Sequence, residues 1–96
     1  MKPVRFLMPA AEEMTESALW YEQQASGLGS TFLDQVEAAA AFIVKFPEVG
    51  EELPDGFRRK LLRQFPFGLL YSVDPDELVV HAVMHLHRRP GYWKDR

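Results

Sequence analysis

The sequence predicts an α+β fold in which a small, mainly antiparallel sheet of four strands packs one face against an N-terminal helical hairpin. The first supporting observation is a pair of apolar stripes with helical spacing between residues 11 and 46, separated by a short link that contains glycines. The second is a series of three strand-like segments between residues 57 and 84, of which the first alternates imperfectly and the other two are apolar runs. A short apolar run also precedes the helices, so the expected order of elements is β-α-α-β-β-β.

The first strand and the first helix are expected near the N-terminus. Residues 4–8 form a short apolar run that Pro9 closes, which favours a strand. The helix that follows is indicated by residues at alternating steps of three and four: Ala11, Met14, Ala18, Tyr21 and Ala25. Gly27 and Gly29 then end this helix, because glycine is the usual residue just past a helix.

The second helix is expected from a stripe with the same spacing: Phe32, Val36, Ala39, Ile43 and Phe46. Gly29 or Ser30 can cap its start, Asp34 favours its positive N-terminal end, and Pro47 ends it. A link of only three or four residues makes the two helices antiparallel neighbours with one shared apolar seam.

The remaining three strands are expected after a polar loop over residues 47–56, whose glycines and prolines indicate turns throughout. The strands are predicted at residues 57–65, 69–73 and 78–84. The sequence Asp-Pro-Asp-Glu at residues 74–77 predicts a tight turn that joins the last two as a hairpin. Because the last strand is almost continuously apolar, we expect it in a central position beneath the helices.

The chain is expected to form one domain over residues 1–96, since a chain of this length buries about two-thirds of the surface that its unfolded state exposes. It contains no cysteine, which excludes a disulfide scaffold and thiolate chemistry. The longest nearly apolar stretch, residues 36–46, is interrupted by Glu37 and Lys45 and falls far short of the ~20 residues that span a membrane. No signal-peptide pattern is present, so we expect a cytoplasmic protein without membrane contact.

Charge is distributed unevenly along the chain. Residues 57–96 hold eight cations and four anions, a net charge of +4, whereas residues 1–56 hold three cations and ten anions, a net charge of −7. The overall net charge of −3 therefore hides a polarised molecule. Such a molecule can present a cationic face to a polyanion or to an acidic protein.

Several short motifs resemble the toxins of type II toxin–antitoxin modules in the RelE/ParE superfamily. In the front half these are Trp20-Tyr21, Gly27-Leu28-Gly29, Phe32-Leu33 and Phe46-Pro47. In the back half they are Arg59 within an apolar strand, Phe65-Pro66-Phe67 leading to Tyr71, and Ala82-Val83-Met84-His85. The most specific element is the tail His85-x-x-Arg88-x-Pro90-x-x-Trp93, and together the motifs cover nearly the whole chain.

The resemblance implies a bacterial growth-arrest toxin that forms a hetero-oligomer with a cognate antitoxin protein, of the kind also known as plasmid stabilisation proteins. RelE-like members cut mRNA on the ribosome, whereas ParE-like members poison DNA gyrase. RNA cleavage by in-line attack needs a base, an acid and a cation for the phosphate. If this chain were such a metal-independent endoribonuclease, its candidate catalytic residues would be Arg59, Arg63, His85, Arg88 and Tyr92.

The overall charge favours the ParE-like activity, which requires no catalytic group. An acidic helical half would repel ribosomal RNA, for which phosphate attraction dominates affinity. The Phe-Pro-Phe strand entry and the Arg-Pro-x-x-Trp tail also look closer to ParE. A RelE-like nuclease is the alternative, and a third reading is a small binding domain without any arrest activity.

Two groups of residues are the candidate binding sites. For the target we predict the arginines and aromatic residues of the tail, which are enriched in binding hot spots: Arg88, Arg89, Tyr92 and Trp93. For the antitoxin we predict Arg58, Lys60 and Trp20, since antitoxins commonly add a strand or lay a helix in a groove. The alternatives are that residues 58–63 form a charged, solvated sheet edge, that the tail arginines pair with helix acids, and that Trp20, Tyr21 and Trp93 belong to the core.

Three histidines near the C-terminus are candidate metal ligands. His81, His85 and His87 share parity on an extended chain, so their side chains could point to one side, as in a metal site. Zinc sites need three or four converging ligands, and no cysteine or matching carboxylate lies nearby. We therefore expect no metal and no cofactor, with His81 as a packed strand residue and His85 as a hydrogen-bonded residue at the strand end.

Overall fold

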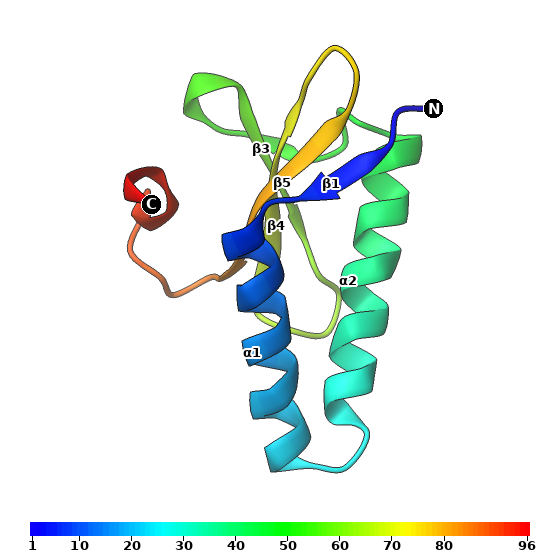
Figure 1. The fold of residues 1–96 in the computed structure, drawn as a ribbon, viewed down its shortest axis with the longest axis vertical. Coiled ribbons are helices and arrows are strands. Elements are labelled where there is room, and N and C mark those ends of the chain that lie inside the picture. Colours follow the sequence, from blue (N-terminus) through cyan, green and yellow to red (C-terminus); the bar gives the residue numbers. More distant parts are fainter.

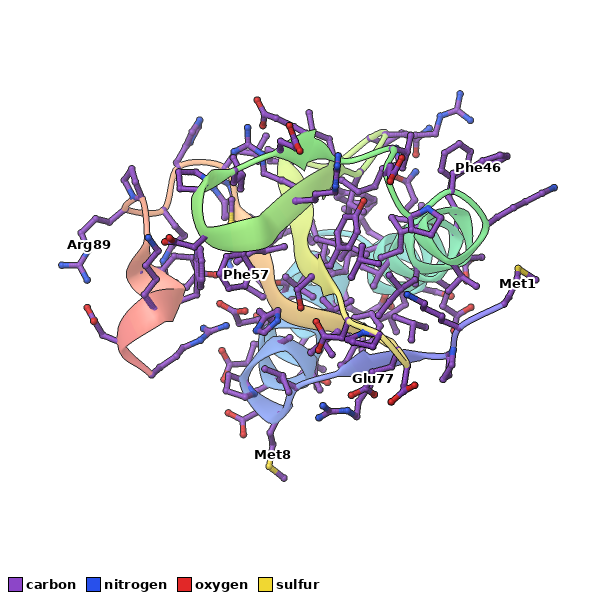
Figure 2. The ribbon with its side chains drawn as sticks, turned by 90° about the horizontal axis from the view of Figure 1, so that it is seen from above. Met1, Met8, Phe46, Phe57, Glu77 and Arg89 are labelled. Atoms are coloured by element: carbon purple, nitrogen blue, oxygen red, sulfur yellow. The ribbon has the colours of Figure 1, made fainter.

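A computed structural model describes all 96 residues, and its helices and larger strands follow the predicted order (Figure 1). The elements are β1 (Val4–Phe6), α1 (Met8–Gln24), α2 (Leu28–Lys45), β2 (Glu51–Glu52), β3 (Phe57–Leu61), β4 (Phe67–Val73) and β5 (Leu78–His85), with short 3₁₀ turns at Pro54–Gly56 and Tyr92–Asp95. The helices form the predicted antiparallel hairpin, and the C-terminal residues lie on the opposite side of the sheet from α2 (Figures 1 and 2).

The sheet is mixed and has five strands in the order β1-β5-β4-β3-β2. Strand β1 pairs in parallel with β5, and the other pairs are antiparallel, so the mainly antiparallel prediction is confirmed. The fifth strand comes from the loop predicted to contain only turns, where Glu51 and Glu52 pair with Arg59 and Arg58. As predicted, β5 lies inside the sheet and a tight turn joins it to β4, closed by the bond from the Asp74 amide to the Glu77 carbonyl.

Two predicted strands are shorter in the structure. The first ends at Phe6 rather than residue 8, because Pro9 occupies the first turn of α1, where its missing N–H needs no partner. The third ends at Leu61 rather than residue 65. The chain bends there, and the Leu62 amide donates to the Phe67 carbonyl, so that the Phe65 side chain can enter the core.

The start of α2 also differs from the prediction. Its N-cap is Gly27, which has a positive φ of 87°, rather than Gly29 or Ser30. The Glu22 carboxylate accepts hydrogen bonds from the amides of Gly27 and Gly29 and thereby ties the end of α1 to the start of α2.

The core lies between the hairpin and the sheet and confirms most of both apolar stripes. The exceptions are Ala11, whose place in the core is taken by Ala10, and Ala25 and Phe46, which are exposed at the helix ends. The centre of the core is a group of aromatic rings. The Phe32 ring lies 5.4 Å from Tyr21, 5.1 Å from Phe65 and 4.9 Å from Phe67, measured between ring centroids. These rings join α1 and α2 to the entry of β4, so the hairpin and the sheet form one unit.

Candidate functional site

The cations of strand β3 lie on both faces of the sheet. Side chains alternate across a strand, so Arg58 and Lys60 face the helices, whereas Arg59 faces the opposite side of the sheet. Residues 58–63 therefore do not form the single charged cluster that the sequence suggested. Arg63 follows the strand and lies with Lys60 on the side of α2.

A groove runs between α2, the loop that follows it and β3. It consists of cavities of about 850 and 490 Å³ that share Phe42, and we call it the α2 groove. Its exposed apolar residues are Phe42, Phe46, Val49, Leu61 and Val73, which are 39–48% exposed. Its cations include Lys2, Lys45, Lys60 and Arg63, and the lysine ammonium groups of Lys60 and Lys45 lie 5.3 and 5.7 Å from the ring centroids of Phe42 and Phe46.

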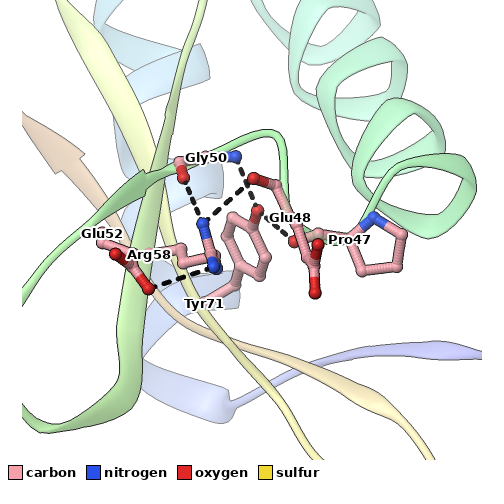
Figure 3. Close-up of polar contacts among 6 residues, drawn as sticks. All are labelled: Pro47, Glu48, Gly50, Glu52, Arg58 and Tyr71. Atoms are coloured by element: carbon pink, nitrogen blue, oxygen red, sulfur yellow. Dashed lines mark hydrogen bonds and ion pairs between the residues drawn. The ribbon is translucent and has the colours of Figure 1, made fainter.

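The wall of the α2 groove is fixed by Tyr71 and Arg58 (Figure 3). The buried Tyr71 hydroxyl donates to the Pro47 carbonyl at 2.7 Å and accepts from the Gly50 amide at 3.0 Å. A Cβ at Gly50 would lie 2.6 Å from this hydroxyl, so the loop can approach only because glycine stands there. Burial raises the pKa of Tyr71.

Arg58 completes the wall. Its guanidinium donates to the carbonyls of Glu48 and Gly50 at 3.0 and 2.9 Å and to the Glu52 carboxylate at 3.3 Å (Figure 3). Most of its hydrogen-bonding capacity is therefore used within the protein. Of the predicted antitoxin-binding residues, only Lys60 presents its charge to the open groove, because Trp20 lies on α1, away from these cavities.

The C-terminal tail, residues 86–96, is held by Glu13 of α1. The Glu13 carboxylate accepts from the Val83 amide at 3.0 Å, from the Tyr92 hydroxyl at 2.5 Å and from the Arg96 guanidinium at 2.9 Å. Arg96 also donates to the His81 carbonyl at 2.9 Å. Because β1 ends at Phe6, the β5 edge beyond Val80 has no partner strand on the β1 side, although β4 pairs with its other side. The side chains of Glu13 and Arg96 bind the backbone groups of this edge instead.

The remaining tail residues cover part of β3 and stay partly exposed to solvent. The Trp93 ring packs against Phe57 at 4.5 Å between centroids, and the Arg88 guanidinium lies 4.1 Å from the Tyr92 ring centroid. Arg88 and Arg89 are exposed and form no salt bridge, so the alternative in which they pair with helix acids is wrong. Burial, followed by the hydrogen bond to Glu13, raises the pKa of the Tyr92 hydroxyl.

The three histidines do not point to one side. A β-bulge opposite Leu70 and Tyr71 changes the parity of β5 at His81. The His81 ring packs against Phe57 and lies 2.9 Å from the Ser72 hydroxyl, whereas the His85 ring packs against Phe67 on the helix-facing side. As predicted, His81 is a packed strand residue, and His85 at the strand end is hydrogen-bonded: its Nδ1 accepts a hydrogen bond from the His87 amide.

The predicted nuclease residues are only partly brought together. Arg59, Arg88 and Tyr92 line one cavity beneath the tail, whereas Arg63 lies in the α2 groove and His85 lines neither cavity. The alternative that Trp20 belongs to the core is wrong, since its side chain is 57% exposed, whereas Tyr21 packs against the core.

The sequence analysis did not identify Glu13 as a functional residue. Its only local signal is its place beside the buried face of α1, three residues after the fully buried Ala10. The groups that it binds are 70 to 83 residues away in the sequence, so no short motif could connect them.

Comparison with known proteins gives two findings. The family model described as "ParE toxin of type II toxin-antitoxin system, parDE" matches residues 4–90. A chain in a solved structure of the chromosomal ParDE TA system from P. aeruginosa superposes with a TM-score of 0.64, covering 88% of this chain and 96% of that one at 18% identity. That identity supports a shared fold. A comparison with curated proteins finds no significant match, and no helix here has the length and apolar character needed to cross a membrane.

Proposed function

The chain belongs to the family of ParE toxins of type II toxin–antitoxin systems, and from this membership we propose that it arrests growth by poisoning DNA gyrase and is neutralised by a cognate antitoxin. The observation that carries this proposal is the family match over residues 4–90, which includes both helices and every strand. Gyrase poisoning requires binding, and an exposed, cationic and aromatic tail is suited to binding.

We assign the two functions to two surfaces on opposite sides of the molecule. Figure 2 shows Phe46 at the α2 groove and Arg89 on the tail, well separated across the sheet. The tail carries Arg88 and Arg89 without salt-bridge partners, and we assign it to gyrase. The α2 groove combines exposed apolar residues with a cationic rim, and we assign it to an acidic amphipathic segment of the antitoxin.

The arrangement of the tail gives little support to a nuclease. General acid–base catalysis requires a group whose pKa lies near the working pH. The Tyr92 hydroxyl already donates to Glu13, and its raised pKa disfavours proton loss. Neither His85 nor Arg63 lines this cavity, so its cations are present without a histidine to act as the base.

The gyrase assignment is tested with purified protein and purified DNA gyrase on supercoiled DNA. We expect the protein to stabilise gyrase-cleaved DNA, and an Arg88→Ala/Arg89→Ala variant to lose at least tenfold in potency because the unpaired cations are removed. Arg5→Gln is a control outside the tail, although it removes one charge from β1 where the double variant removes two. Absence of cleaved DNA, together with codon-positioned cuts in ribosome-bound mRNA, would overturn the assignment in favour of a nuclease.

The antitoxin assignment is tested by co-expression with a cognate antitoxin. Lys60→Glu reverses a charge on the rim of the α2 groove and should weaken antitoxin binding at least tenfold, so that growth arrest persists despite the antitoxin. The same variant should still act on gyrase in vitro, because Lys60 and the tail lie on different faces of the sheet. Full neutralisation of Lys60→Glu would exclude the groove as the main antitoxin surface.

A further inference from the structure

A cavity lies between β3 and the C-terminal tail that we assign to gyrase. Its volume is about 360 Å³, and we call it the tail pocket. Its charged lining residues are all cations: Arg59, Arg88, Arg89 and Lys94. In a chain with a net charge of −3, this is a local concentration of positive charge, and an anion is the ligand that it favours.

Arg59 lies on β3, and its side chain is on the face of the sheet that borders this pocket. Gly68 on β4 leaves the space for it, because a Cβ there would lie 3.0 Å from Cγ and 3.3 Å from Cδ of Arg59. One terminal nitrogen donates to Glu51 at 2.6 Å, but the buried Nε has no hydrogen-bond partner. A buried donor without a partner destabilises a protein, so a shift of the Arg59 side chain toward an anion in the pocket would relieve this cost.

The other cations leave charge available for a ligand. Lys94 approaches Asp55 only at 3.5 Å, and their side chains are 49% and 70% exposed. Arg88 and Arg89 have no acidic partner, and the Arg89 guanidinium points away from the body of the protein (Figure 2). Three of the four cations are arginines, whose planar fork matches a phosphate in two parallel hydrogen bonds.

Aromatic rings beside these cations indicate the rest of the ligand. Tyr92 and Trp93 both line the tail pocket, with Arg88 stacked over the Tyr92 ring. Proteins that hold single-stranded nucleic acid combine a cationic path for the backbone with rings on which bases stack. Arg88 and Arg96 already lie over the Tyr92 ring, so the partly exposed Trp93 ring is the one on which a base can stack. An acidic peptide would use the cations but supplies no base for this ring, so the combination favours a nucleotide.

We infer that the tail pocket binds one nucleotide of a single-stranded nucleic acid, with its phosphate at Arg59 and Arg88 and its base against the aromatic residues of the tail. The volume is at the lower end of the range of about 300–1,000 Å³ for ligand sites, which suits one unpaired nucleotide. A duplex does not fit this description, because its bases are stacked within the helix. The inference goes beyond gyrase poisoning, since it assigns a nucleic-acid contact to the toxin itself.

The test is binding of fluorescein-labelled dT8, U8 and an eight-base-pair duplex to the purified 96-residue protein, measured by fluorescence anisotropy at 50 and 200 mM NaCl. We expect dT8 or U8 to bind at least tenfold more tightly than the duplex and to weaken at the higher salt concentration. Tighter binding of dT8 assigns the site to DNA, tighter binding of U8 assigns it to RNA, and equal binding assigns it to the chemistry that they share.

Variants locate the site. Arg59→Gln and Arg88→Gln should each weaken dT8 binding about tenfold, whereas Arg5→Gln makes the same charge change on β1 and should change it less than twofold. Arg88 is exposed, so its variant keeps the fold even if Arg59→Gln does not. Equal losses in Arg88→Gln and Arg5→Gln, stronger duplex binding, or displacement of dT8 by an octaglutamate peptide at lower concentration than by unlabelled dT8 would each overturn the inference. Gyrase is absent from this assay, so its outcome is independent of the gyrase proposal.

Discussion

The α2 groove and the C-terminal tail are two exposed surfaces that are held in different ways. The groove is continuous with the core: Ala39 in its floor is buried, and Tyr71 connects its loop to the central strand β4. The tail contributes no buried residue, since none beyond Val83 is buried, and its position depends on hydrogen bonds that converge on Glu13. The groove should therefore keep its shape until the protein unfolds, whereas the tail can open locally.

The strongest way to disrupt both surfaces at once is to remove the Phe32 ring. Phe32 is fully buried and contacts the rings of Tyr21, Phe65 and Phe67. Phe32→Ala should lower the free energy of unfolding by about 3–5 kcal/mol, because it leaves a cavity between the hairpin and the sheet. Urea denaturation followed by circular dichroism measures this loss. Phe42→Ala is the control, since its ring is 42% exposed and its loss should cost much less; equal losses would contradict the assignment of Phe32 to the core.

The core was predictable because burial leaves a periodic record in the sequence. Val36 and Ile43 are buried at the positions that the helical spacing indicated, and the apolar run of β5 lies inside the sheet. Strand β2 was missed because two glutamates, Glu51 and Glu52, are too few to show an alternation, and their pairing depends on β3. The bulge at His81 depends in the same way on the register with β4, which the sequence of β5 alone does not contain.

The candidate sites were less predictable than the core. The residue types of the tail were found, but the contacts that position it were not, since Glu13 and Arg96 are 83 residues apart. The sequence indicated that the cations of β3 form one group, yet Arg59 and Lys60 lie on opposite faces of the sheet because side chains alternate along a strand. Polar contacts between distant segments have no period, so only the folded chain reveals them.

A narrower change separates the groove from the tail. Tyr71→Phe removes the hydroxyl that the Gly50 amide and the Pro47 carbonyl both use, and it leaves these groups unpaired near the core. We expect a loss of about 1–3 kcal/mol in the free energy of unfolding. Hydrogen exchange measured by NMR should show faster exchange of the Gly50 amide, while the Val83 amide at the tail contact stays protected. Equal acceleration at both amides would show that the two surfaces are coupled.

The reciprocal change is Glu13→Gln, which preserves size but removes the charge that Arg96 and the Tyr92 hydroxyl share. The tail should open while the core and the α2 groove persist, so the global free energy of unfolding should fall by at most about 1–2 kcal/mol. In a Trp20→Phe background, Trp93 is the only tryptophan, and its emission should shift to longer wavelength as its ring becomes solvated.

A Glu12→Gln variant in the same background is the control for that measurement, because Glu12 is a neighbouring, exposed acid without a contact to the tail. Its Trp93 emission should equal that of the parent. If Glu13→Gln also leaves the emission unchanged, the hydrophobic contact between Trp93 and Phe57 holds the tail by itself, and the contrast between the two surfaces is weaker than inferred.

The smallest expected effect is a pH dependence at His81, beneath the tail. Burial is the main cause that lowers the pKa of His81 below its ordinary value of 6.5, with Arg5 acting in the same direction and Asp74 against it. The unfolded chain therefore binds a proton more readily than the folded protein. The resulting stability is fully present above pH 6.5 and is lost as the pH falls through the lower pKa of the folded state. The urea concentration at the midpoint of unfolding should therefore decrease in the parent as the pH is lowered from 7.5 to 5.5, and it should decrease less in His81→Gln. His87→Gln, which changes an exposed histidine, should follow the parent. A parallel course for His81→Gln and the parent would mean that the layer formed by Phe57 and Trp93 admits water to the imidazole, and that the tail is open on average.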